Sequence, residues 1–176
     1  VSIAYIEDGV AQIGVVHAPA QGETFTAMLN CGATLNEQQI SVAAVDKLIE
    51  ATIAFGTGTP RIRDQLAPIA QPQLGACFRR CRDLRRLGAA TLDICWVACG
   101  RLHAFHELAL HSWDIAAARL IASEAGALTG EVWNGLRSSQ VPKDLYATDV
   151  LIAVPGIYKE LQETLKVCED LPACLQ

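Results

Sequence analysis

The sequence predicts an α/β protein, a layered α/β sandwich with an amino-terminal antiparallel meander and a carboxy-terminal α/β layer. Residues 1–6 alternate apolar and polar side chains with a period of two, and residues 10–17 and 24–29 supply two more strand-like runs. From residue 60 onward, helix-like and strand-like segments follow one another in turn. The chain has 176 residues, 51% hydrophobic and 19% charged, which is enough apolar material for a folded core.

The first part of the chain, residues 1–50, is expected to supply the antiparallel strands. The alternating runs predict three strands, at residues 1–6, 10–17 and 24–29. Between the first two runs, Glu7-Asp8-Gly9 has the composition of a tight turn. From Cys31 to Ser41 the sequence becomes polar, and no strand is assigned there.

The second part, residues 51–167, is expected to form the α/β layer. Strands are predicted at residues 51–55, 84–87, 102–107 and 150–154. Helical patterns with Gly and Pro boundaries predict helices at residues 60–81, 89–99, 114–125 and 155–167. Residues 134–146 are expected to be irregular, and residues 168–176 form a tail without a motif.

The composition favours a small soluble ligand over a macromolecular polyanion. The net charge of −5 gives no general attraction to nucleic acid or to an anionic membrane. No charged-then-apolar signal segment and no apolar run long enough to span a bilayer occurs, so we expect a soluble, cytoplasmic protein. The first residue, Val1, already lies inside an alternating pattern, and we expect the chain to be a fragment.

The seven cysteines are expected to be reduced thiols. They are scattered, without the close CxxC pairs that are typical of zinc ligands. Cys77 and Cys81 are one helical turn apart, as are Cys95 and Cys99, and small buried apolar side chains are favoured over a shared metal.

The most informative motif is Trp113-Asp114 at the predicted start of a helix that ends with Glu124-Ala125-Gly126. An aspartate there can simply cap the helix. Gly88 and Glu107 precede this motif, however, and together they resemble the inositol-monophosphatase family of magnesium-dependent, lithium-sensitive phosphomonoesterases in order and spacing. The Trp113-Asp114 motif itself resembles the second signature of that family. The resemblance extends from residue 1 to about residue 165 and corresponds to the carboxy-terminal portion of that family.

This resemblance implies a fold of the sugar-phosphatase type, of which the amino-terminal part is missing. Residues 1–50 would be strands of the family's first sheet, and residues 51–167 its substrate and metal half. Asp114 would be a ligand of Mg²⁺, an ion that prefers hard oxygen ligands. The family's other metal ligands lie in Glu-Glu and Asp-Pro-(Ile/Leu)-Asp-Gly-Thr motifs, which do not occur here.

Four further residues match positions that contact substrate in the family: Thr57, Gly88, Ala90 and Glu107. Thr57 lies in a glycine-rich turn, and Gly88 and Ala90 lie where a strand leads into a helix. A carboxylate such as Glu107 suits a polyol, because it accepts hydrogen bonds from vicinal hydroxyls. Without the family pattern, the glycines and Ala90 would indicate only close packing, and Glu107 only a solvated charge at the end of a strand.

The resemblance implies hydrolysis of a small phosphorylated polyol, such as inositol monophosphate, with Mg²⁺ as cofactor and a homodimer as the assembly. Because the paired carboxylates are absent, we expect this chain alone to be inactive. The alternative function is a non-catalytic phosphatase module retained for dimer or regulatory contacts.

Two other clusters compete with this interpretation. His103, His106 and His111 lie close to Glu107 and Asp114 in the sequence and could suit zinc, but strand periodicity sends His103 and His106 to opposite faces. The basic run from Arg79 to Arg86 could bind an acidic partner or a substrate phosphate, although a solvated face or subunit contact is favoured.

Overall fold

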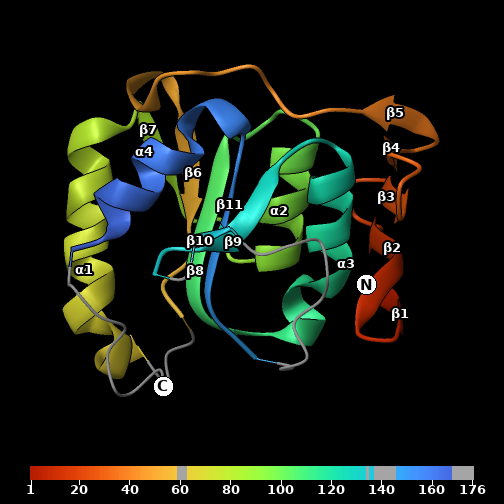
Figure 1. Cartoon of the computed structure of the whole chain (residues 1–176), viewed down its shortest axis with the longest axis horizontal. Coiled ribbons are helices and arrows are strands. Elements are labelled where there is room, and N and C mark those ends of the chain that lie inside the picture. The colour runs from red at the N-terminus through yellow and green to blue at the C-terminus, as the bar shows by residue number, and fades with distance from the viewer. Residues whose placement is uncertain (59–62, 134, 137–145, 168–176) are drawn as a thin grey trace.

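The computed structural model describes residues 1–58, 63–133, 135–136 and 146–167, which form two β-sheets and the helices between and beside them. In Figure 1 the layers follow one another across the view: the first sheet, then α2 and α3, then the second sheet, then α1 and α4. The layered α/β sandwich predicted from the sequence is therefore confirmed.

The first sheet is an antiparallel meander in the order β1-β2-β3-β4-β5. Its strands are β1 (Ser2–Glu7), β2 (Val10–Ala18), β3 (Glu23–Met28), β4 (Ala33–Leu35) and β5 (Gln38–Ile40). The polar stretch to which no strand was assigned thus contains β4 and β5. Asn36 and Glu37 connect them with φ angles of 48° and 68°, the left-handed conformation that a two-residue hairpin turn requires.

The second sheet is mixed, in the order β10-β9-β11-β8-β6-β7. Its strands are β6 (Thr52–Phe55), β7 (Asp83–Arg85), β8 (Ala104–His111), β9 (Leu128–Glu131), β10 (Gly135–Leu136) and β11 (Tyr146–Ala153). β6 runs parallel to β7 and β8, whereas β11 runs antiparallel to β8 and β9.

The prediction that Glu107 ends its strand was wrong. β8 continues to His111, because β11 pairs with it as far as Tyr146 opposite His111. Ala109, in the middle of this extension, has a φ of 59°, so the regular alternation of side chains is interrupted there. Glu107 consequently lies within the sheet, four residues before the strand leads into a helix.

Four α-helices occur in the residues that the structure describes: α1 (Arg63–Arg80), α2 (Ala90–Ala98), α3 (Ser112–Glu124) and α4 (Pro155–Leu165). α3 packs against the first sheet on one side and the second on the other. Its inner face is rich in alanine, which allows the strands to come close. A Cβ added to Gly14 of β2 would lie only 2.7 Å from the carbonyl oxygen of Ala117.

The outer face of the first sheet is apolar and uncovered in this structure. Ile3, Tyr5, Ile13 and Met28 are 61%, 53%, 43% and 52% exposed, and the register sets Tyr5 opposite Ile13 and Ile13 opposite Met28. We call these four side chains the apolar row.

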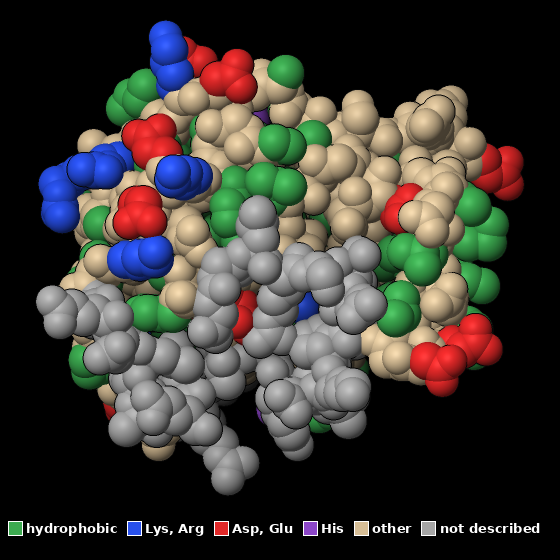
Figure 2. Space-filling view, viewed as in Figure 1, with side chains coloured by type: hydrophobic (Ala, Val, Ile, Leu, Met, Phe, Trp, Pro, Cys, Tyr) green, Lys and Arg blue, Asp and Glu red, His purple; other side chains and the backbone are tan. Residues whose placement is uncertain are grey.

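The surface charge is mixed. On the face in Figure 2, Lys and Arg side chains gather on the side of α1 and α4, among acidic ones, whereas the side of the first sheet carries acidic but no basic side chains. Of the helices that the structure describes, none combines the length and the apolar character that crossing a membrane requires. Cys77, Cys81 and Cys95 are buried free thiols, as expected, while Cys99 is half-buried and Cys31 exposed.

Candidate active site

A cleft of ≈ 400 Å³ opens where β8, the start of α2 and the start of α3 meet; we call it the carboxylate cleft. It is lined by Gly58, Arg63, Arg86, Gly88, Ala89, Ala90, Thr91, Glu107, Leu110 and Asp114. Four of the five site residues expected from the sequence are in this list. Gly88, Ala90, Glu107 and Asp114 are thus brought together from segments up to 26 positions apart.

Asp114 lies in the first turn of α3, as expected of a helix start. The helix begins at Ser112, however, so His111 occupies the N-cap position, and the Asp114 Oδ2 accepts a hydrogen bond of 3.0 Å from the His111 N–H. The Thr91 hydroxyl donates to the Asp114 carbonyl at 2.6 Å, which ties the start of α3 to that of α2. A carboxylate in the first turn is favoured by the helix dipole.

Glu107 is held by the glycine-rich turn that follows β6. Its Oε1 accepts a hydrogen bond of 3.1 Å from the Gly58 N–H, and any Cβ at Gly56 would overlap its Cδ and Oε2. Glu107 is only 8% exposed, and this burial raises the pKa of its carboxyl. The Gly58 N–H and the Arg86 guanidinium oppose the effect of burial by lowering this pKa, whereas the charge of Asp114 raises it.

The Gly88 turn joins β7 to α2. Gly88 has a φ of +95°, a conformation that strains any other residue, and its Cβ position would come 3.1 Å from the Arg86 Nη1. Ala90 is the first residue of α2. Backbone N–H groups in the first turn of a helix have no partner within the helix and point away from its start. Small residues here leave room for a ligand to approach the backbone.

The structure places Thr57 beside the cleft and not in it. Its hydroxyl accepts a hydrogen bond of 3.2 Å from the Arg86 Nε. Thr57 lines a neighbouring pocket that shares Arg63 and Arg86 with the carboxylate cleft.

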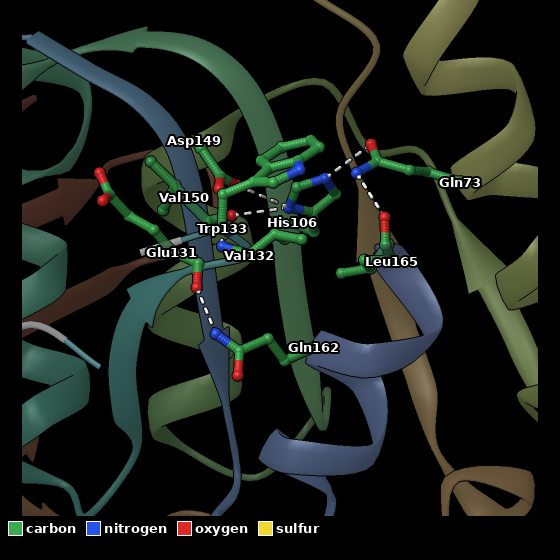
Figure 3. A network of polar contacts seen from close by, with 9 residues as sticks. All are labelled: Gln73, His106, Glu131, Val132, Trp133, Asp149, Val150, Gln162 and Leu165. Carbon is green, nitrogen blue, oxygen red and sulfur yellow. Dashed lines mark hydrogen bonds and ion pairs between the residues drawn. The ribbon is translucent and has the colours of Figure 1, made fainter. Parts of the chain in front are cut away.

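His103 and His106 do not converge with the carboxylates, whereas His111 lies beside Asp114 as the N-cap of α3. His106 is fully buried behind Glu107, where its Nε2 lies 3.0 Å from the Gln73 Oε1 and its Nδ1 3.0 Å from the Val150 carbonyl (Figure 3). Burial lowers the pKa of His106 to about 4, and the hydrogen bond to the Val150 carbonyl acts in the opposite direction. The His103 Nδ1 accepts the Thr52 N–H at 2.9 Å. Within the described part of the chain, no three His, Cys, Asp or Glu side chains are placed to share a metal ion.

One acidic residue near the cleft was missed by the sequence analysis. Asp93 on α2 is only 3% exposed, and its Oδ1 has no hydrogen-bond partner among the residues whose positions are described. Its pKa is raised to about 7, chiefly by burial and also by the charge of Glu107, while Arg86 acts in the opposite direction. An aspartate within an apolar helical run was the available signal, since such a run is expected to be buried on most sides.

The carboxylate cleft fits Mg²⁺ only as part of a site. Asp114 offers a hard oxygen at the cleft surface, which suits this ion. Glu107 is engaged by Gly58 and lies deeper, so it is better placed for a hydroxyl than for a cation. A complete set of magnesium ligands is therefore not present in the residues that the structure describes.

Known proteins that resemble this chain share both its sequence and its fold. The Nus factor SuhB of Pasteurella multocida is 36% identical over 168 residues, which is 96% of this chain and 60% of that protein. The Nus factor SuhB of Vibrio cholerae is 38% identical over 77% of this chain and 50% of its own length. The crystal structure of the extragenic suppressor protein suhB from Bartonella henselae matches with a TM-score of 0.83 and 29% identity, over 94% of this chain and 61% of that one. Mycobacterium tuberculosis SuhB matches with a TM-score of 0.77 and 33% identity, over 94% and 62%.

The chain thus spans between half and three fifths of the curated relatives that it matches. The model of the inositol monophosphatase family matches residues 1–172, and the chain belongs to that family.

Proposed function

We propose that this chain is the substrate-recognition part of a magnesium-dependent phosphomonoesterase that hydrolyses a small phosphorylated polyol, such as inositol monophosphate. The observation that carries the proposal is the carboxylate cleft, in which Glu107, Asp114 and the Gly88 turn line one cavity. The family membership supports the class of reaction.

Each group in the cleft has a role that its position favours. Glu107 accepts hydrogen bonds from the polyol hydroxyls, and the turn at Gly56 and Gly58 fixes its side chain for that purpose. The Gly88 turn and the start of α2 bring backbone N–H groups to the ligand. Asp114 contributes one ligand of the magnesium site. Mg²⁺, when bound, polarises the phosphate and lowers the pKa of a coordinated water.

A second candidate is a non-catalytic module retained for dimer or regulatory contacts. The relatives from Pasteurella multocida and Vibrio cholerae are named for a role as a Nus factor and not for an ester that they hydrolyse. The apolar row, which is exposed in this structure, is the surface that favours such contacts.

Binding measurements on the 176-residue polypeptide separate the two candidates. We expect calorimetry to detect weak binding of inositol 1-phosphate that improves with Mg²⁺. Glu107→Gln should weaken it by about tenfold, because a hydrogen bond to a charged acceptor is lost, and Asp114→Asn should remove the effect of Mg²⁺. Glu163→Gln is the matched control, since this exposed carboxylate pairs with Lys166 near the end of α4 and lines neither the carboxylate cleft nor any of its described walls.

Phosphate release gives the second readout. We expect no turnover by this chain, because the family's paired carboxylates do not occur in it. Equal binding in the Glu107, Asp114 and control variants would favour the non-catalytic module. Robust turnover that Asp114→Asn abolishes would show that this chain holds all the catalytic ligands, contrary to our assignment.

A further inference from the structure

Strand β8 changes the facing of its side chains once, just after Glu107. Glu107 lines the carboxylate cleft, and Leu108 lies on the opposite face, where it packs with two residues of α1. Ala109 packs against this same cluster on the side of α1, whereas Leu110 lines the cleft again. Two consecutive residues of the strand therefore share one face, and the alternation of its side chains is shifted by one position.

The backbone of Ala109 produces this shift. Its φ of 59° belongs to the left-handed region, which an alanine rarely adopts. Pairing with β11 continues on both sides, with Asp149 opposite Leu108 and Ala147 opposite Leu110. The shift consequently lies inside the sheet and does not end the strand.

A left-handed backbone inside a strand has no role in reversing the chain. In the described part of the chain, the other residues with positive φ that are not glycine lie in turns between strands: Asp8, Asn30, Asn36 and Glu37. Such angles are what a tight turn requires. At Ala109 the chain does not turn back, so the strained conformation is kept for another reason. Strain of this kind persists only where the surrounding structure fixes it, and it is concentrated at functional sites.

The shift decides which face of the sheet the start of α3 reaches. A displacement of one residue reverses the face of every following side chain in a strand. Without the shift, Leu110 would point toward α1, and α3, which begins two residues later at Ser112, would leave the sheet from the other face. With the shift, Asp114 lines the same cleft as Glu107, and its Oδ2 accepts the His111 N–H at 3.0 Å.

We propose that Ala109 is a positioning residue of the candidate active site: its left-handed backbone turns the end of β8 so that Asp114 reaches the cleft that Glu107 lines. Ala109 itself does not line the cleft, so it acts through Asp114. Glu107 precedes the shift and is held by the Gly58 N–H, so its place does not depend on Ala109. The inference rests on the proposed function in one respect, since the role of Asp114 as a magnesium ligand belongs to that function.

Three variants separate the backbone of Ala109 from general strain. Ala109→Val adds a branch at Cβ, which makes a positive φ much less favourable. Ala109→Gly removes the strain and keeps the conformation accessible. Glu37→Val is the matched control, because Glu37 has a φ of 68° in the turn between β4 and β5 and does not line the cleft.

Calorimetry of inositol 1-phosphate, with and without Mg²⁺, gives the first readout. In the parent chain and in Ala109→Gly, Mg²⁺ should improve the affinity to the same extent. In Ala109→Val this improvement should fall to a factor near one, while the affinity without Mg²⁺ changes little, because Glu107 keeps its place. Glu37→Val should bind as the parent does. If the valine variant is not folded in buffer, the parent and the three variants are compared in trimethylamine N-oxide, which favours the compact state.

Exchange of two backbone amides gives a readout that needs no ligand. The His111 N–H donates to Asp114 and the Gly58 N–H to Glu107, so each amide reports where one carboxylate lies. Measured by nuclear magnetic resonance, the His111 amide should exchange about tenfold faster in Ala109→Val than in the parent, because a hydrogen bond to a charged acceptor is lost. The Gly58 amide should exchange at the parent rate, and neither amide should change in the glycine and control variants.

Three results would overturn the proposal. One is an unchanged exchange rate of the His111 amide in Ala109→Val, or an undiminished response of this variant to Mg²⁺. The second is a loss of that response in Ala109→Gly, since the methyl group and not the backbone would then be required. The third is an equal loss in Glu37→Val, which would indicate a general loss of stability. Failure of the proposed function is recognised separately: Mg²⁺ would then not improve binding by the parent chain, and the exchange of the His111 amide alone would decide the role of Ala109.

Discussion

Gly14 lies in β2 where the first sheet packs against α3, and its replacement by alanine tests that packing. Its neighbours across the sheet, Ala4 and Ala27, are also small. A Cβ at Gly14 would lie 2.7 Å from the Ala117 carbonyl oxygen and 3.2 Å from the Ala117 Cα. These are backbone atoms of a buried helix, which cannot rotate away as a flexible side chain can. Gly14→Ala therefore forces β2 and α3 apart.

The expected loss of stability follows from how far the Ala117 carbonyl oxygen must move away from the added Cβ. Ordinary contact begins at 3.4 Å, so the carbonyl must retreat by about 0.7 Å from its 2.7 Å position. Overpacking of this kind costs about 1–3 kcal/mol in the free energy of unfolding. For a chain of this length, we expect the melting temperature to fall by roughly 2–12 °C.

Equilibrium unfolding in urea, followed by far-ultraviolet circular dichroism at low protein concentration, measures this change. Gly75→Ala is the matched control. Gly75 lies inside α1, and the nearest atom to its added Cβ is the Arg79 Nη1 at 3.6 Å. Because alanine is the better helix former, this variant should be more stable than the parent by up to about 1 kcal/mol. If Gly14→Ala unfolded at the same urea concentration as the parent, the close packing of α3 on the sheet would be refuted.

Three further predictions concern stability. Ala109→Gly should stabilise the chain by about 1 kcal/mol in the same urea assay, because φ at this position is 59°; a loss would contradict the strain. The pKa of Asp93 is raised to about 7, so its contribution to the free energy of unfolding should fall as pH rises from about 4 to 7. The pKa of His106 is lowered to about 4, so its contribution should fall as pH drops from about 6.5 to 4. Because the two effects oppose each other over the same pH range, Asp93→Asn should leave only the loss of stability toward pH 4 and His106→Asn only the loss toward pH 7. The urea midpoint plotted against pH measures this, and profiles unchanged from the parent would refute the assignments. The apolar row should make the chain bind a hydrophobic dye or aggregate, whereas a soluble, dye-negative monomer with a cooperative thermal transition would refute this.

The order of strands and helices could be predicted because most elements carry a clear period. The three strand-like runs within residues 1–29 predicted three strands of the meander, and the helical pattern around Asp114 predicted α3 to within two residues. β4, β5, β9 and β10 were missed, the last within residues expected to be irregular, because two to four residues are too few to show a period. The end of β8 was misplaced because the positive φ of Ala109 interrupts the alternation while pairing with β11 continues.

The candidate site was predicted where a motif specifies both a residue type and its spacing. Glu107, Asp114 and Gly88 meet those conditions, and the structure brings them to one cleft. Thr57 was expected in that cleft. In the turn after β6, however, the N–H of the next residue, Gly58, points to Glu107, and the Thr57 hydroxyl accepts a hydrogen bond from Arg86. No local pattern could reveal this, since it depends on contacts between segments about 30 to 50 positions apart.

Strand β8 connects the interior of the protein to the carboxylate cleft through two adjacent residues. His106 points to the side of α1, where it meets Gln73, and its Nδ1 also lies 3.8 Å from the Asp149 Oδ1 (Figure 3). Glu107 points to the opposite face and lines the cleft. Gln73 belongs to the same helix as Arg63, which lines the carboxylate cleft.

The contact between His106 and Gln73 therefore fixes α1 against the strand that carries Glu107. Gln73 also donates to the Leu165 carbonyl at 3.0 Å, so the end of α4 holds the same point of α1. Both partners of this contact are fully buried, and breaking it would leave unsatisfied polar groups in the core. The distance between the arginine at the start of α1 and the carboxylate on β8 is thus set from inside the protein, by residues that touch no ligand.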